Sequence, residues 1–257
     1  MDKISYDLYK TGPFKKLPHE IREAINKNII PLNIKNINYF NDDMCKDFIK
    51  NNFKSDVLNA YNILIPSAYK ADLWRFCVLY INGGIYGDLT QHFIKNFDIN
   101  EKNPDMIFVK DRPINSIQIS FIATIKNNPF IKYIIDNLVE KILKHDKGKS
   151  HLDVTGPITI GTYFLSYFKN SKIELGFYEY EGLDNNIYKV YIPFKHLNTN
   201  NITDKNNNIY INLYIKNHRK LLYNKNNKRY HILWDKNNVF YDSIKGTWNK
   251  TSRNIKY

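Results

Sequence analysis

The 257-residue chain contains only two cysteines, Cys45 and Cys77, and no run of 18 apolar residues. Two cysteines cannot form a disulfide framework, and the lack of a long apolar run leaves no candidate membrane span. The first residues, MDKISYDLYK, are too polar for a signal peptide. We therefore expect a soluble protein in the cytoplasm of a cell or of a host cell, with no transmembrane segment.

Several catalytic and phosphate-binding patterns are also missing. The sequence has no Walker P-loop and no G-x-G-x-x-G fingerprint, and Ser67 and Ser120 lack the context of a nucleophile elbow. The histidines, among them His151 and His231, are not spaced as a metal cluster. These absences exclude the common P-loop, dinucleotide-binding and serine-hydrolase classes.

Aromatic residues and positive charge are abundant. Aromatics make up 15% of the chain, which is typical of a folded protein, and the formal net charge is +13. The charge has two interpretations: a lysine-rich composition with scattered charges, or binding of an anionic partner. Basic grooves with stacking aromatics also occur in single-strand nucleic-acid binders, but no recognised nucleic-acid module is present, so we expect no specific nucleic-acid partner.

Hydrophobic periodicity predicts alternating strands and helices in the first half of the chain and a strand-rich last third. Asp42, Asp43 and Ser55 stand where helix N-caps are expected. The expected strands are 4–11, 32–40, 85–86, 106–109, 117–124, 175–180, 188–192, 209–215 and 230–234. The expected helices are 17–28, 44–53, 56–64, 67–82, 129–145 and 157–168, and the expected loops include 198–208, 224–228 and 236–238. This order favours an α/β sheet sandwiched by helices, with added β structure at the end.

The segment 67–82 is the clearest helix of the first half, and it ends at Gly83-Gly84. Asp72 and Arg75 are three residues apart on it and so share a face, and a short strand then leads to Asp88. A carboxylate at the end of a strand can hold Mg²⁺ or Mn²⁺ together with substrate phosphates, Arg75 can add a fixed positive charge, and Asp72 can accept hydrogen bonds from sugar hydroxyls. The spacing equally fits a surface ion pair, a glycine C-cap and a loop acid.

The segment from Ala71 to Thr90 resembles the signature of glycosyltransferase family 32, the group with a DXD-containing sugar-binding region. The family pattern is roughly A-D-x-x-R-x-x-x-L-x-x-x-G-G-x-Y-x-D-x-D, and every specified position but the last matches in order. Weaker similarity extends to Thr155-Gly156-Pro157, which resembles a downstream T-G-P element, and to Gly246-Thr247-Trp248, which resembles a C-terminal G-S-W element. The family includes fungal mannosyltransferases and is related to the clostridial glucosylating toxins.

The resemblance implies a GT-A-type α/β fold, with a Rossmann-like nucleotide-binding sheet and the acceptor site alongside. It implies transfer of a hexose from a UDP- or GDP-sugar to a glycan or other hydroxyl acceptor, with retention of configuration and usually with Mn²⁺ (or Mg²⁺). Asp72 and Arg75 would contact the donor sugar and its phosphates, and Asp88 would touch the ribose and the metal. Gly84 and Tyr86 would shape the pocket.

The sequence departs from the family at Thr90, where the second Asp of DXD is expected. Three outcomes follow, in order of preference: the metal is held by Asp88, the diphosphate and a C-terminal ligand; the enzyme works without metal; or donor binding survives without catalysis. Asp242 is the candidate for the missing acidic ligand, although it also fits a loop acid. Trp248 fits either a lid over the donor or simple packing.

We expect one GT-A-like domain over 1–257, with a donor-binding core at about 1–125 and the acceptor side and a C-terminal lid at about 126–257. The leading hypothesis is an active glycosyltransferase. A catalytically weakened relative that binds a nucleotide sugar or glycan is the second hypothesis, and a basic nucleic-acid-binding protein is the third.

Overall fold

The computed structural model describes residues 3–26, 29–89, 91–93, 96–195, 201–203, 209–212 and 229–241. Its helices are α1 (His19–Asn26), the 3₁₀ turn η1 (Ile30–Leu32), α2 (Asp42–Asn52), α3 (Ser55–Ile63), α4 (Ser67–Asn82), α5 (Pro129–Leu143), α6 (Pro157–Tyr167) and α8 (Tyr230–Asp235). Its strands are β1 (Asp7–Thr11), β2 (Asn36–Phe40), β3 (Gly84–Gly87), β4 (His92–Phe93), β5 (Met106–Lys110), β6 (Ile117–Thr124), β7 (Gly176–Glu181), β8 (Ile187–Ile192), β9 (Phe194–Lys195), β10 (Asn201–Thr203) and β11 (Ile209–Asn212).

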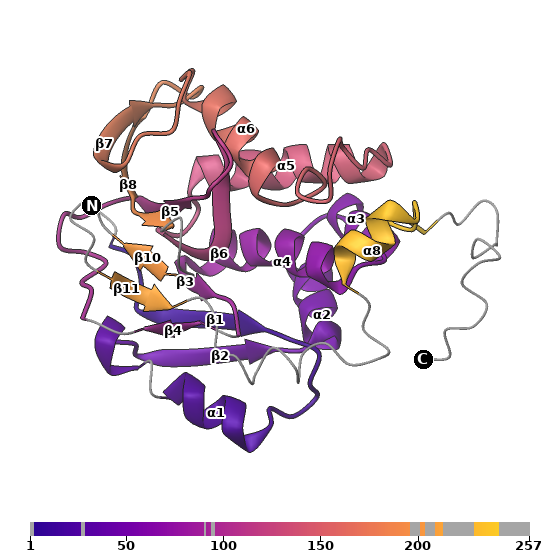
Figure 1. The fold of residues 1–257 in the computed structure, drawn as a ribbon, viewed down its shortest axis with the longest axis horizontal. Coiled ribbons are helices and arrows are strands. Elements are labelled where there is room, and N and C mark those ends of the chain that lie inside the picture. The colour runs from indigo at the N-terminus through magenta and orange to yellow at the C-terminus, as the bar shows by residue number, and fades with distance from the viewer. Residues whose placement is uncertain are drawn as a thin grey trace.

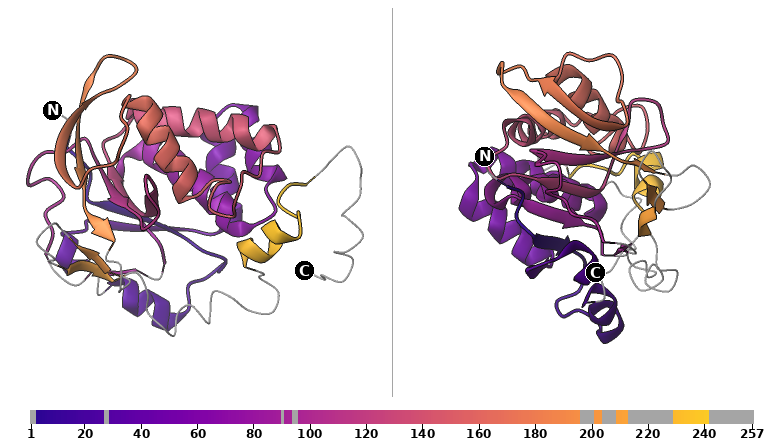
Figure 2. Two further views of the ribbon diagram at one scale, coloured as in Figure 1. Left: turned by 45° about the horizontal axis from the view of Figure 1, so that its top comes forward. Right: turned by 90° about the vertical axis from the view of Figure 1, so that its left-hand side faces the viewer.

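All described strands join one mixed sheet. Nine of them follow the order β2-β1-β3-β6-β5-β9-β10-β11-β4, and β7 and β8 lie off this path. Strands β2, β1 and β3 are parallel, β6 is antiparallel to both β3 and β5, and β8 pairs with β5 and β7. The parallel part is the Rossmann-like unit predicted from the sequence, and the α/β architecture expected of a GT-A-type fold is confirmed. Figures 1 and 2 show α1 beyond β2 at one end and the β7–β8 hairpin beside α6 at the other.

The sheet separates two clusters of buried apolar side chains because successive strand residues point to opposite faces. Tyr9, Tyr86 and Phe108 lie in the larger cluster, under the helices α2 to α6. Their neighbours, such as Leu8 and Ile85, lie in the smaller one. The residues that cover this second face come from η1, from the segment around Phe93 to Ile99 and from β10. Helix α1 also packs beside β2, where its Ile21 and Ile25 lie in one cluster with Ile37 and Tyr39. The sheet is thus flanked by helices, as predicted.

Helix α4 lies at the centre of the helical layer and is buried nearly all round. It contacts β1, β3 and β6 below it and α2, α3, α5 and α8 around it. Its bounds are those the hydrophobic spacing predicts, and its C-cap is Gly83, at φ 67°. Gly84 follows at φ 93°, and a Cβ there would lie 2.7 Å from the carbonyl oxygen of Asp7, so β1 and β3 can pair closely only at a glycine.

Four local predictions are wrong. The strand expected at 32–40 begins only at Asn36, after the 3₁₀ turn η1. The strand expected at 230–234 is the helix α8, because Tyr230, Leu233 and Trp234 use helical spacing to pack on one side. The loop expected at 198–208 contains the strand β10, which pairs with β9 and β11. The N-caps of α2 and α3 each lie earlier than expected, at Asn41, whose side chain accepts from the amide of Met44, and at Lys54.

The packing predicts a large contrast between two isoleucines. Ile134 is fully buried on α5, whereas Ile114 is 90% exposed in the loop between β5 and β6. We expect Ile134→Ala to lower the free energy of unfolding by about 2–5 kcal/mol. The matched control Ile114→Ala should change it by less than about 0.5 kcal/mol. Urea unfolding measures both, and equal effects would contradict the core described above.

Candidate functional site

The candidate site lies where β3 ends, beside the buried face of α4. Asp88 directly follows β3, and its amide donates to the carbonyl of Ser120 in β6 at 2.9 Å. Because β1 and β3 are parallel, their carboxyl ends meet at the same edge of the sheet. This is the edge at which ligands bind in open α/β sheets.

Asp72 and Arg75 form a buried ion pair on α4. Oδ1 of Asp72 lies 2.7 Å from Nη2 of Arg75, and the two side chains are 11% and 6% exposed. The guanidinium also donates to the carbonyls of Ile119 and Ala71 and stacks 4.4 Å from the ring centre of Tyr86. The pair is therefore not the exposed surface bridge that the spacing alone allowed.

Asp88 joins this network from the loop after β3. Its Oδ1 accepts from the Tyr86 hydroxyl at 2.9 Å and lies 3.6 Å from Nη1 of Arg75. Its side chain is 41% exposed, unlike that of Asp72. Both of these contacts use Oδ1. The structure thus brings together Asp72, Arg75, Tyr86 and Asp88, and within this group Asp88 is the carboxylate that solvent reaches most.

The carboxylate of Asp72 is buried. Burial raises its pKa from 3.8 to about 6, against the opposing effects of the Arg75 charge and of a hydrogen bond from Thr155. At neutral pH the group is ionised, paired with Arg75 and able to accept further hydrogen bonds. An acceptor of this kind suits the hydroxyl groups of a sugar.

Thr155 is a site residue whose contact the sequence reasoning missed. Its hydroxyl donates to Oδ2 of Asp72 at 2.7 Å, and its side chain is fully buried. The available signal was the T-G-P element before α6, but nothing in the spacing connects position 155 with a carboxylate 83 residues earlier.

Lys10 is a second site residue whose contacts the sequence reasoning missed. This lysine of β1 is fully buried, and its ammonium donates to the carbonyls of Gly87 and Asp88 at 3.2 and 3.0 Å. Burial lowers its pKa from 10.5 to about 8, and the charge of Asp88 acts in the opposite direction. Lys10 therefore supports the backbone of the loop that presents Asp88. The only signal in the sequence was a lysine inside an otherwise buried strand.

Of the two carboxylates predicted to bind the metal, only Asp88 lies among the described residues. Among the residues the structure describes, no group of three or more His, Cys, Asp or Glu side chains is arranged to hold a metal ion. Asp88 is the more exposed of the two described site carboxylates, whereas each oxygen of Asp72 already contacts Arg75 or Thr155. Thr90, Asp242 and Trp248 lie outside the described residues, so the roles predicted for them remain predictions. Within the described chain, no helix has both the length and the apolar character needed to cross a membrane.

Comparison with known proteins supports the resemblance. Residues 18–113 match the family described as glycosyltransferase sugar-binding region containing DXD motif, and these residues include α4, β3 and Asp88. An uncharacterized glycosyltransferase of Acanthamoeba polyphaga mimivirus is 34% identical over 85 residues, which are 32% of this chain and 33% of the relative. The chain therefore spans about one third of the length of this curated relative.

One solved structure, titled PaToxG glycosyltransferase, aligns with 64% of this chain and 70% of its own, with a TM-score of 0.49 and 16% identity.

The raised pKa of Asp72 predicts how stability depends on pH. Its pKa is 3.8 when exposed and about 6 when folded, so the folded state binds the additional proton between these values. The free energy of unfolding of the wild type should therefore fall, relative to Asp72→Asn, as the pH rises from about 4 to 6, by up to about 3 kcal/mol. Above pH 7 the difference in the free energy of unfolding between the wild type and Asp72→Asn should be constant. Urea unfolding at half-unit pH steps measures it, and a difference independent of pH between 4 and 7 would refute the assignment.

Proposed function

We propose that this chain, whose residues 18–113 match the DXD-containing sugar-binding region of glycosyltransferases, transfers a hexose from a nucleoside-diphosphate sugar to a hydroxyl acceptor with retention of configuration. The observation that carries the proposal is the network of Asp72, Arg75, Tyr86 and Asp88 at the carboxyl edge of β1 and β3. Its members are four of the positions at which the sequence matches the family signature.

Each residue has a role that its environment supports. Asp88, the most exposed of the four, would meet the donor directly and accept from its ribose. Asp72 would accept from hydroxyl groups of the donor sugar, with its orientation held by Thr155 and Arg75. Arg75 holds both carboxylates and supplies a fixed positive charge beside the diphosphate. Tyr86 orients Asp88 through its hydroxyl. Such prearranged groups stabilise charge that develops as the diphosphate leaves.

Mn²⁺ or Mg²⁺ fits this site only in part. The ion would be held by Asp88 and by oxygens of the donor diphosphate, with Asp242 as the proposed further protein ligand. When bound, it would neutralise charge on the leaving diphosphate. Thr90 cannot replace a carboxylate on such a hard cation, so we propose that the chain holds the metal mainly through the donor.

The second candidate is a relative that binds the donor but has lost turnover. The observation in its favour is Thr90, at the position of the second DXD acid. Release of free sugar from UDP- or GDP-sugars in the presence of Mn²⁺, followed by mass spectrometry, separates the two functions. Turnover supports the enzyme, whereas tight donor binding with no hydrolysis or transfer supports the binding protein.

The donor site is tested by a thermal-shift panel of UDP-glucose, UDP-galactose, UDP-N-acetylglucosamine and GDP-mannose, with and without Mn²⁺. At a concentration of 100 times Kd, a donor adds about 2.7 kcal/mol of stability, and this corresponds to a rise in Tm of roughly 5–10 °C. We expect Asp88→Ala to abolish the shift, and Thr90→Asp to tighten Mn²⁺ binding.

The matched control is Asp136→Ala, which removes an exposed carboxylate of α5 that pairs with Lys132 on the surface. It should keep the full shift. A shift that survives in Asp88→Ala, or is lost equally in Asp136→Ala, would count against the donor site.

A further inference from the structure

A cluster of aromatic and imidazole rings lies next to the helical turn that precedes Asp72 on α4. Its members are Tyr69 of α4, His151, and Tyr230 and His231 of α8. Tyr69 precedes Asp72 by three residues and therefore shares its face, about 4.5 Å away along the helix axis. The Tyr69 ring lies 5.6 Å from that of Tyr230, and its hydroxyl donates to the carbonyl of His151 at 2.9 Å. The His151 ring lies 5.6 Å from Tyr230 and 6.0 Å from His231.

The loop that carries His151 also reaches the donor carboxylate. Four residues after His151, the hydroxyl of Thr155 donates to Asp72. The cluster and the candidate donor site are therefore joined twice, through α4 and through the segment 151–155. A ligand lying on these rings would be adjacent to a sugar bound at Asp72.

Helix α8 is fixed in place, so the cluster is prearranged. The indole N–H of Trp234 donates to the carbonyl of Lys147 at 2.9 Å, and the Lys147 ammonium lies 4.7 Å from the indole ring centre. After the helix, the chain pairs with residues 63–65: Ile65 donates to the carbonyl of Val239, and Tyr241 donates to that of Ile63. A rigid platform loses little entropy when a ligand binds.

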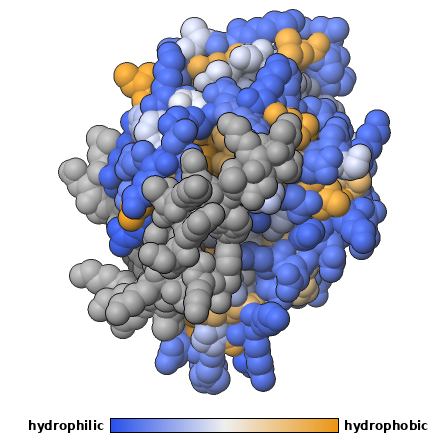
Figure 3. Space-filling model, turned by 90° about the vertical axis from the view of Figure 1, so that its right-hand side faces the viewer, coloured by the Kyte–Doolittle hydropathy of each residue, from blue (hydrophilic) through white to orange (hydrophobic). Residues whose placement is uncertain are grey.

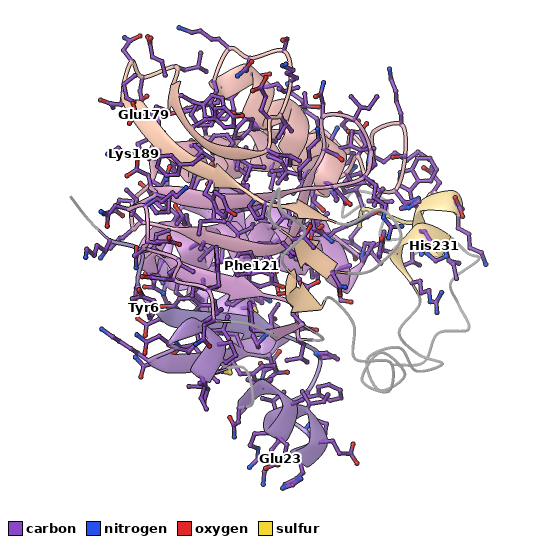
Figure 4. All side chains as sticks on the ribbon, turned by 60° about the vertical axis from the view of Figure 1, so that its left-hand side comes forward. Tyr6, Glu23, Phe121, Glu179, Lys189 and His231 are labelled. Carbon is purple, nitrogen blue, oxygen red and sulfur yellow. The ribbon has the colours of Figure 1, made fainter. Side chains whose placement is uncertain are left out.

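The rings of the cluster differ in burial. Tyr69 is fully buried, whereas His151, Tyr230 and His231 are half-buried. Figure 4 shows His231 on α8, at the side of the molecule away from the β7–β8 hairpin. On the part of the face in Figure 3 that is not drawn in grey, hydrophobic residues lie in small patches among hydrophilic ones.

The geometry points to a binding site for the acceptor sugar, formed by His151, Tyr230 and His231. This inference rests on the proposed function, because the site is defined by its position next to the donor carboxylate Asp72. Aromatic rings offer an electron-rich face to the C–H groups of a pyranose, and each imidazole adds a hydrogen-bonding nitrogen for a hydroxyl group. The ligand class is therefore a pyranose, either a monosaccharide or the terminal residue of a glycan.

The test uses the methyl glycosides of glucose, galactose, mannose and N-acetylglucosamine as probes, in saturation-transfer NMR with UDP or GDP present. At least one glycoside should bind the wild type. The double variant His151→Ala/His231→Ala should bind it at least tenfold more weakly, while its thermal shift with nucleotide sugars stays unchanged. The control is His19→Ala, which removes an 81% exposed imidazole of α1 outside the cluster and should bind like the wild type.

The outcomes distinguish the acceptor-site inference from the proposed function. Equal glycoside binding by the double variant, or no binding of any probe by the wild type, overturns the acceptor site and leaves the donor site untouched. If no nucleotide sugar shifts the wild type, the proposed function fails, whatever the glycosides do. Loss of both glycoside binding and the donor shift in the double variant also overturns the inference, because the cluster would then serve the donor or the fold.

Discussion

The guanidinium of Arg75 is the group on which the site and its surroundings both depend. It is almost fully buried, and it is bound by the Asp72 carboxylate from its own helix, the Ile119 carbonyl from β6 and the Tyr86 ring from β3. A buried charge is stable only when it is paired and hydrogen-bonded, and loss of one partner typically costs about 3–5 kcal/mol. Arg75 thus connects the helical layer to the sheet at the point where Asp88 leaves β3.

This arrangement explains why α4 combines two kinds of surface. Leu73, Phe76 and Cys77 are fully buried in the main core, and the same helix carries the strip of Tyr69, Asp72 and Arg75 toward the edge of the sheet. A helix surrounded by neighbours on nearly all sides cannot shift without disturbing both the core and the site. The proposed donor carboxylate Asp72 lies on this rigid element, and Tyr69 of the same helix contacts Tyr230 and His151 of the proposed acceptor platform. Such an arrangement suits a reaction that requires two sugars at a defined separation.

Much of this could be predicted from the sequence, because local signals agree with the fold. The bounds of α4 follow from apolar spacing and the glycine stop, and the ordered match around Asp72, Arg75 and Asp88 identified residues that the fold brings into contact. The contacts of Thr155 and Lys10 could not be predicted, because each depends on a partner about 80 residues away. The short apolar run at Tyr230–Trp234 is compatible with either a strand or a helix, and packing against α4 decides for the helix.

The most direct test of the role of Arg75 is calorimetric binding of UDP-glucose and GDP-mannose to Arg75→Lys. Lysine keeps the positive charge, but it lacks the planar fork that reaches Asp72, Ile119 and the face of Tyr86 together. We expect a folded protein whose Kd for the bound donor rises at least about tenfold, a loss of about 1.4 kcal/mol. An unchanged Kd in a folded Arg75→Lys protein would show that the guanidinium network does not form the donor site.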